Sequence, residues 1–149
     1  MYLFLLFLHI AAAAAWIGGS LRTVIEGPMV RGAQPVARSA WYRNQVGLGT
    51  RLFAPAAVVV LVTGILLVLN NDAIGFGAPF VSIGFAAVIF GAAVGPAVFG
   101  KRGEAAAAML DAGDTAGADA IAVKTRPIEM LDTVILLITL AAMVWKWGL

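Results

Sequence analysis

His9 is the only histidine in this chain of 149 residues, and it lies in an apolar run that begins near Tyr2. At the helical rise of about 1.5 Å per residue, it would be roughly 10 Å from the start of a helix. An ionisable side chain at that depth of an apolar segment is uncommon and marks a candidate functional site. A neutral imidazole that hydrogen-bonds a neighbouring helix is the plainer alternative.

The residues that share a face with His9 suit a flat ligand. At helical spacing, small residues, an indole and a hydroxyl group follow it on one stripe: Ala12, Ala13, Trp16, Gly19 and Ser20. Small side chains leave room for a porphyrin, and the imidazole could bind its iron. The sequence leaves the cofactor open, and haem b is the candidate, with His9 as an axial ligand beside Trp16.

Met143 is the candidate for a second axial ligand. It lies about six residues before Leu149, and therefore roughly 9 Å from the end of a helix. Methionine and histidine together are a known haem ligand pair, so His9 and Met143 could hold haem or copper if their helices are neighbours. A homodimer could instead pair two copies of His9. The simpler interpretation of Met143 is a flexible apolar side chain that fills a packing gap.

Charged residues border the apolar runs. Arg22 and Glu26 have the i, i+4 spacing of a helical ion pair, and Arg51 opens the second run. Glu129 and Asp132 open the fourth run, where carboxylates favour the positive end of a helix. Arg22 and Arg51 could contact an anionic group, such as a haem propionate or a lipid phosphate. The alternative is a structural charge network at a membrane surface.

The composition indicates what must position these residues. The chain is 62% hydrophobic and only 12% charged, whereas soluble domains are about half apolar and a quarter charged. Helices of about 20 apolar residues cross the hydrocarbon core of a bilayer and satisfy their own backbone there. We therefore predict one all-α domain over residues 1–149, a four-helix transmembrane bundle with helices at 2–24, 52–70, 81–99 and 128–147.

The distribution of Lys and Arg predicts the orientation. The connection after the first run and the connector 100–127 carry most of these residues, whereas the short connection that begins at Asn70 has none. The positive-inside rule places the two basic connections in the cytoplasm and both termini outside. We expect 100–127 to be a solvated connector, with an interfacial helix over Ala105 to Leu110 as the alternative.

Small residues at four-residue spacing predict where helices approach closely. Lipid gives helices no hydrophobic drive to associate, so such contacts matter for packing. They are Ala11, Ala15 and Gly19 in the first helix and Gly91 and Gly95 in the third, where Pro96 should add a kink. Packing within the bundle is the expected role, and a dimer face or a slot for a flat ligand is the alternative.

Several segments resemble a known family. The runs Leu8-His9-Ile10 and Trp16-Ile17-Gly18-Gly19 resemble the first helix of a small bacterial family of integral membrane proteins of unknown function. The segments from Arg51 to Pro55 and from Thr63 to Leu67 are similar to its second helix, and Asp132 to Lys146 to its fourth. The resemblance spans most of the chain and implies a multi-pass protein of the bacterial inner membrane.

More distantly, the pattern is similar to haem b-binding membrane protoporphyrinogen oxidases and to copper-resistance D proteins. In the oxidases a functional histidine precedes a tryptophan in the first helix, as His9 precedes Trp16. Those enzymes also need a lysine in the third helix. This chain departs from that pattern, because Val81 to Phe99 contains no lysine and Lys101 follows the run. The departure counts against oxidase activity and leaves haem binding open.

Other chemistry is sparse. The chain has no cysteine for a disulfide or a thiolate site, and it has no nucleotide-binding glycine loop. Its net charge of +2 is not typical of a nucleic-acid-binding protein. We therefore predict a non-enzymatic helical subunit or scaffold in the bilayer, which packs with itself or with a larger membrane complex. The alternative is a haem b-binding redox protein centred on His9; whether the protein is an enzyme stays open.

Overall fold

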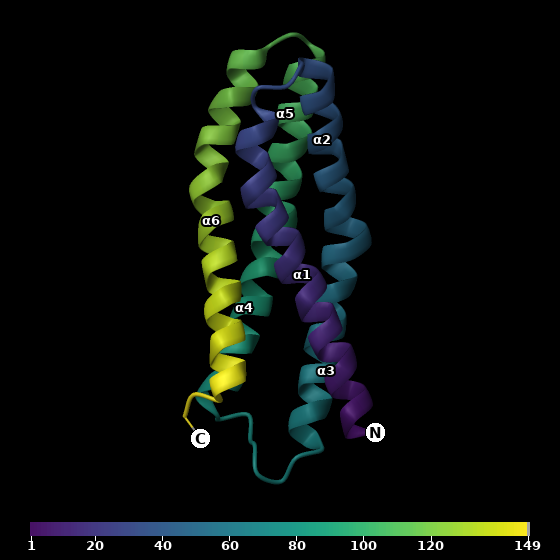
Figure 1. Cartoon of the computed structure of the whole chain (residues 1–149), viewed down its shortest axis with the longest axis vertical. Helices are drawn as coiled ribbons and strands as arrows, with labels where there is room; N and C mark the ends of the chain where they lie inside the picture. The colour runs from purple at the N-terminus through teal and green to yellow at the C-terminus, as the bar shows by residue number, and fades with distance from the viewer. Residues whose placement is uncertain (149) are drawn as a thin grey trace.

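The computed structural model describes residues 1–148, and these form helices joined by short turns, with no strand. The helices join into four rods, which run along one axis (Figure 1). The first and the fourth rods are single helices, α1 (Tyr2–Val30) and α6 (Thr115–Trp145). The second rod joins α2 (Pro35–Leu48), η1 (Gly49–Phe53) and α3 (Ala54–Leu69). The third joins α4 (Pro79–Val94), η2 (Gly95–Gly100) and α5 (Lys101–Asp111).

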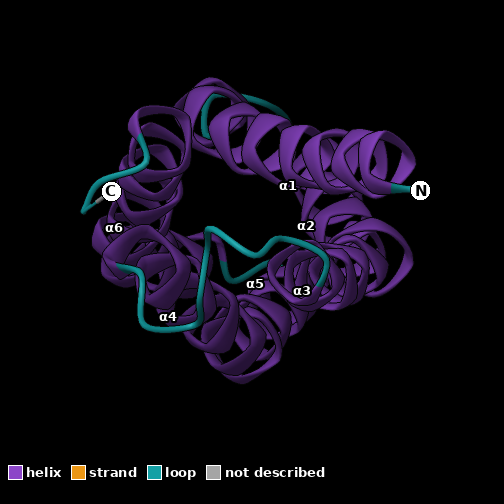
Figure 2. Cartoon of the chain, turned by 90° about the horizontal axis from the view of Figure 1, so that it is seen from below, coloured by secondary structure: helices purple, strands orange, loops and turns teal. Residues whose placement is uncertain are grey.

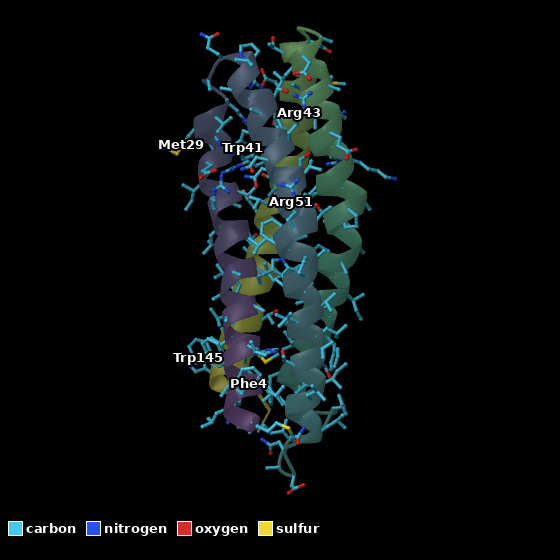
Figure 3. All side chains as sticks on the ribbon, turned by 90° about the vertical axis from the view of Figure 1, so that its right-hand side faces the viewer. Phe4, Met29, Trp41, Arg43, Arg51 and Trp145 are labelled. Carbon is cyan, nitrogen blue, oxygen red and sulfur yellow. The ribbon has the colours of Figure 1, made fainter. Side chains whose placement is uncertain are left out.

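Each rod is long and apolar enough to cross a membrane. Large apolar side chains such as Phe4 and Trp145 are 63% and 70% exposed and lie near one end of the rods (Figure 3). A hydrocarbon phase would cover such side chains, whereas water would not. The all-α class and the four helices able to span a membrane are therefore confirmed.

The rods have two different ends. Both termini and the turn between α3 and α4 lie at one end, here called the terminal end (Figure 1). The α1–α2 and α5–α6 turns lie at the other, here called the far end. The predicted arrangement, with both termini on one side of the bundle, agrees with this layout.

The helices continue well beyond the apolar runs, which corrects the predicted connector 100–127. That segment contains α5, a short turn and the first part of α6, so the helix considered over Ala105 to Leu110 is a part of α5. Alanine is the best helix former, and α5 packs on α2 with Ala106 and Ala107 almost fully buried. Hydropathy marks only the length that lipid can cover, so it could not define these helical extensions.

Polar contacts join the helices at the far end. Arg38 on α2 forms an ion pair with Asp119 on α6, and Arg43 forms one with Asp111 on α5. The buried Ser39 hydroxyl also donates to Asp111, at 2.6 Å. The far end therefore combines an alanine interface with polar contacts between helices.

Two short π-helical segments interrupt the second and third rods. In η1 the Ala54 N–H bonds the Gly49 carbonyl, five residues back, just before Pro55. Proline has no N–H to donate, and η2 contains Pro96, at the predicted kink. The two π-helical segments contact each other, so both rods change their helical pitch at one level of the bundle.

One core layer holds the rods together below that level. Viewed along the axis, the helices form a ring in which α1 lies beside α3 and α6, and α4 lies beside α3 and α6 (Figure 2). Each rod contributes one buried side chain to the layer: Trp16, Ala56, Val88 and Leu136. The Trp16 indole fills the space beside Gly91, where an added Cβ would overlap it.

Gly91→Ala should therefore destabilise the fold. The new methyl group would overlap the Trp16 indole, and overpacking of this kind costs about 1–3 kcal/mol. The free energy of unfolding can be measured by titration of the detergent-solubilised protein with a denaturing detergent, followed by circular dichroism. Gly95→Ala is the matched control, because a Cβ there meets nothing within 4 Å. Equal effects of the two substitutions would contradict the packing assigned to Gly91.

Candidate functional site around His9

His9 is held between two helices. Its Nδ1 atom lies 3.0 Å from the Oγ1 atom of Thr63 on α3. The next residue, Gly64, makes this approach possible, because a Cβ there would lie only 3.3 Å from the His9 Cε1 atom. The Thr63-Gly64 pair therefore fixes the imidazole ring from one side.

The hydroxyl group of Thr63 also determines which ring nitrogen of His9 carries the proton. Thr63 Oγ1 donates its only proton to the Val59 carbonyl, at 2.5 Å. It must then accept from His9, so Nδ1 carries hydrogen and Nε2 of the neutral ring has a free lone pair. Histidines that bind metal show this arrangement, since they donate their other ring N–H to a protein group.

His9 lines a cavity of about 690 Å³ in the terminal half of the bundle. All four rods contribute to the wall, which is mostly apolar and includes three helix glycines: Trp16, Gly18, Gly64, Gly84, Val88 and Leu136 are among its residues. The spaces beside Gly64 and Gly84 are occupied by the His9 and Met143 side chains, whereas nothing lies within 4 Å of a Cβ added at Gly18. The arrangement suits a large, flat and apolar ligand.

The cavity has a polar border at the terminal end. Tyr2, Asn71 and Lys146 line it there, one each from the first, second and fourth rods or their edges. Lys146 follows α6 in the left-handed conformation, with φ of 47°. These side chains could hydrogen-bond the polar end of a ligand whose apolar part lies deeper.

Trp16 lines the cavity away from the terminal end. Its side chain is buried, with 8% exposed, and it contacts the core layer. The same indole also lines a second cavity toward the far end. Trp16 therefore lies between two interior spaces, which its position in the sequence did not reveal.

Met143 lines the same cavity as His9, and α1 and α6 are neighbours as the proposed ligand pair requires. The two side chains nevertheless face different helices. His9 lies against Thr63 and Gly64 on α3, whereas the Met143 methyl group occupies the space beside Gly84 on α4. The structure thus places both in one cavity without a contact between them.

The two arginines considered as anion contacts lie elsewhere. Arg22 forms an ion pair with Glu26, at 2.7 Å, and Glu26 also accepts from the Trp41 indole N–H. Arg51 is exposed on η1, at the outside of the bundle (Figure 3). Neither arginine lines the cavity around His9. A ligand in that cavity would therefore find its polar partners at the terminal end.

The small residues singled out for packing have different surroundings. A Cβ added at Gly19 would overlap Phe53 of η1, so α1 and the second rod meet closely there. Gly91 contacts Trp16, whereas Gly95 has open space around it. In the first helix Ala11 is exposed and Ala15 is partly buried.

Residues 1–148 contain no group of three or more His, Asp or Glu side chains placed to hold a metal ion. Comparison of the chain with models of protein families, with characterised proteins and with solved structures finds no match. The site must therefore be interpreted from its own geometry.

Replacement of Thr63 by valine tests the position and tautomer of His9. Valine keeps the shape of threonine but cannot accept from Nδ1, and an unsatisfied donor costs about 1–3 kcal/mol. Because the chain has one histidine, labelling with ¹⁵N-histidine gives a single pair of ring signals. In the native protein we expect the neutral ring to carry its proton on Nδ1 and none on Nε2. In Thr63→Val we expect that preference to be lost and the free energy of unfolding to be lower.

Thr139→Val is the matched control for that experiment. Thr139 lines the same cavity, but its hydroxyl group donates only to the Ile135 carbonyl of its own helix. The His9 signals should stay unchanged in this variant. A native protein with the proton on Nε2 would show that the assigned hydrogen bond is wrong.

Proposed function

We propose that this protein is a multi-pass membrane protein that binds haem b in the cavity around His9. The observation that carries the proposal is the position of His9 on the wall of a large apolar cavity, with its Nδ1 atom 3.0 Å from Thr63 Oγ1. The donor role inferred for Nδ1 leaves the Nε2 lone pair for a metal. Haem iron binds neutral imidazole in this form. This proposal takes up the alternative function that the sequence left open, a haem b-binding protein with His9 as an axial ligand.

The residues of the cavity fit the macrocycle. Its volume of about 690 Å³ lies within the range of roughly 300–1,000 Å³ that is usual for cofactor sites. The space beside Gly64 holds the His9 ring and the space beside Gly84 holds the Met143 methyl group, so both side chains lie against the cavity wall, which Trp16 also lines. Lys146 at the terminal end could pair with a propionate, and Tyr2 could donate to it.

The cofactor would supply one-electron chemistry, and the chain would hold it and set its environment. Thr63 orients the imidazole, and the hydrogen bond from Nδ1 makes Nε2 a stronger donor to a metal. The apolar wall would keep water from both macrocycle faces. Met143, in the same cavity, could supply a second axial ligand if its thioether turned from Gly84 toward the interior.

The orientation in the membrane is part of the proposal. Arg31, Arg38 and Arg43 lie on or just before α2, and Arg102 lies on α5, in the half toward the far end, whereas Lys146 follows α6 at the terminal end. The positive-inside rule supports a cytoplasmic far end and termini outside, and the resemblance to a bacterial family supports the inner membrane. The role of a non-enzymatic subunit or scaffold, in a homo-oligomer or a larger complex, stays a prediction, since no observation favours it over haem binding.

Haem binding can be tested with the purified protein in detergent. Titration with hemin should give a saturable Soret band at about one haem per chain, with a sharpened visible spectrum on reduction. His9→Ala should lose the spectrum, because it removes the imidazole ligand. Met143→Leu should shift the reduced spectrum and the potential if the thioether binds iron, and leave both unchanged if it only lines the cavity.

A control variant and two possible contrary results complete this test of haem binding. The matched control is Thr139→Val, which alters the same cavity without touching an iron ligand and should keep the native spectrum. A preparation that remains without a specific Soret band after addition of hemin, or a His9→Ala variant that binds haem like the native chain, would exclude the proposed function.

A further inference from the structure

Asp132 is a carboxyl group in the middle of a helix able to span a membrane. The sequence placed it at the start of the fourth helix, where the partial positive charge of a helix N-terminus stabilises a carboxylate. Since α6 begins at Thr115, Asp132 lies more than roughly four helical turns beyond that end and one turn from Leu136 of the core layer. Its side chain is buried, with 6% exposed. An ionisable group at such a position is a candidate functional site.

The charged form of Asp132 has little support from its surroundings. Among the described residues, no Lys or Arg forms an ion pair with this carboxyl group. Its hydrogen-bond partner is the Ser20 hydroxyl group on α1, at 3.2 Å. Burial of an unpaired carboxylate costs far more free energy than burial of a neutral carboxylic acid. The surroundings therefore favour the protonated form.

Three contacts between oxygen atoms also require a proton on Asp132. Asp132 Oδ2 lies 3.2 Å from Ser20 Oγ, which in turn lies 2.7 Å from Thr133 Oγ1. Thr133 Oγ1 lies 3.0 Å from the Glu129 carbonyl oxygen. Each contact needs one hydrogen atom, but the two hydroxyl groups bring only two and the carbonyl brings none. The third hydrogen atom must therefore come from the Asp132 carboxyl group.

The other charged groups on the neighbouring elements are distant along the rods or paired. The helices α1, α4 and α5 pack against α6, beside which α1 lies in Figure 2. On α1, Arg22 pairs with Glu26, and α4 has no charged residue. On α6 itself, Arg126 lies six residues toward the far end and donates to the Val24 carbonyl, at 2.8 Å. Arg126 is thus held by another acceptor and leaves Asp132 without a counter-charge.

The cavity toward the far end gives Asp132 a route to water. It has a volume of about 550 Å³, and Asp132 and Ser20 both line it. The rest of its wall includes the following charged side chains, on α5, on α6 and after α1: Arg31, Lys101, Arg102, Glu104, Arg126 and Glu129. Charged walls favour water, so a proton can pass between Asp132 and the far end through this cavity.

We propose that Asp132 is a proton-binding site, a carboxylic acid that is neutral at neutral pH and exchanges its proton with the far end. In this form its O–H donates to Ser20, Ser20 donates to Thr133, and Thr133 donates to the Glu129 carbonyl. Deprotonation breaks one O–H bond and passes the proton to water in the cavity. It leaves a negative charge and one contact without a hydrogen atom. The site is separate from the cavity around His9 and does not rest on haem binding.

The test is infrared spectroscopy of the intact chain in a maltoside detergent, which has no carbonyl group of its own. At neutral pH the native chain should show the C=O stretch of a protonated carboxyl group, above the amide bands and sensitive to D₂O. Asp132→Asn should lose this band, because it replaces the acid by an amide of the same shape. Ser20→Ala should move the band to higher frequency, because the acid O–H loses its acceptor.

Melting temperatures give a second readout of the same proton. The folded chain would hold a proton that the unfolded chain releases, so stability falls as pH rises. For a chain of this size, the native melting temperature should fall relative to that of Asp132→Asn by about 3–5 °C per pH unit above about pH 5. The comparison with Asp132→Asn cancels the contributions of the other ionisable groups.

The matched control is Asp72→Asn, in the exposed turn between α3 and α4, which should keep both the band and the pH dependence. A native chain without the band at neutral pH would overturn the proposal, and so would an Asp132→Asn variant that keeps it. A melting-temperature difference that does not change with pH would also contradict it. Hemin titration of Asp132→Asn should match that of the native chain, which keeps this outcome distinguishable from the test of haem binding.

Discussion

The Trp16 indole occupies the space that Gly91 leaves without a side chain, and it lines both cavities of the bundle. In a bilayer the hydrophobic effect does not drive helices together, so close packing and polar contacts must hold them. Trp16 belongs to the layer to which each of the four rods contributes one buried side chain.

The two halves of the bundle are held by different forces. Around the core layer, glycines let large side chains of adjacent helices interlock, as Phe53 does at Gly19. At the far end, the alanine face of α5 packs on α2, while Arg38 and Arg43 pair with carboxylates of neighbouring helices. The Arg43–Asp111 pair is exposed and contributes little, whereas Arg38 is buried and Asp119 gives its charge a partner. The polar contacts fix which helices meet.

Hydropathy and charge were sufficient to predict the helical class, the four apolar spans and the common end of the two termini. They could not predict how far the helices extend toward the far end. The helix α5 forms because alanine favours helices and because α5 packs on α2, and neither cause produces an apolar run in the sequence. His9 and Met143 could be placed in the same half by counting residues. The orientation of His9 depends on Thr63, the lone hydroxyl group of the second apolar run, at a depth similar to that of His9. The similar depth of Thr63 and His9 in their apolar runs was the feature of the sequence that could have predicted this contact.

The partner of Arg22 was predictable from i, i+4 spacing, whereas the absence of both Arg22 and Arg51 from the cavity around His9 follows only from the packing of the rods.

The contact between η1 and η2 has a mechanical consequence. A π turn and a proline each remove regular i to i+4 bonds, so bending a rod is cheapest where they occur. Both points lie at one level, in adjacent rods, whereas the internal prolines of α1 and α6, Pro28 and Pro127, lie nearer the far end. Residues of η1 and η2 line the cavity toward the far end. Bending of the second and third rods at this level would therefore change the shape of that cavity.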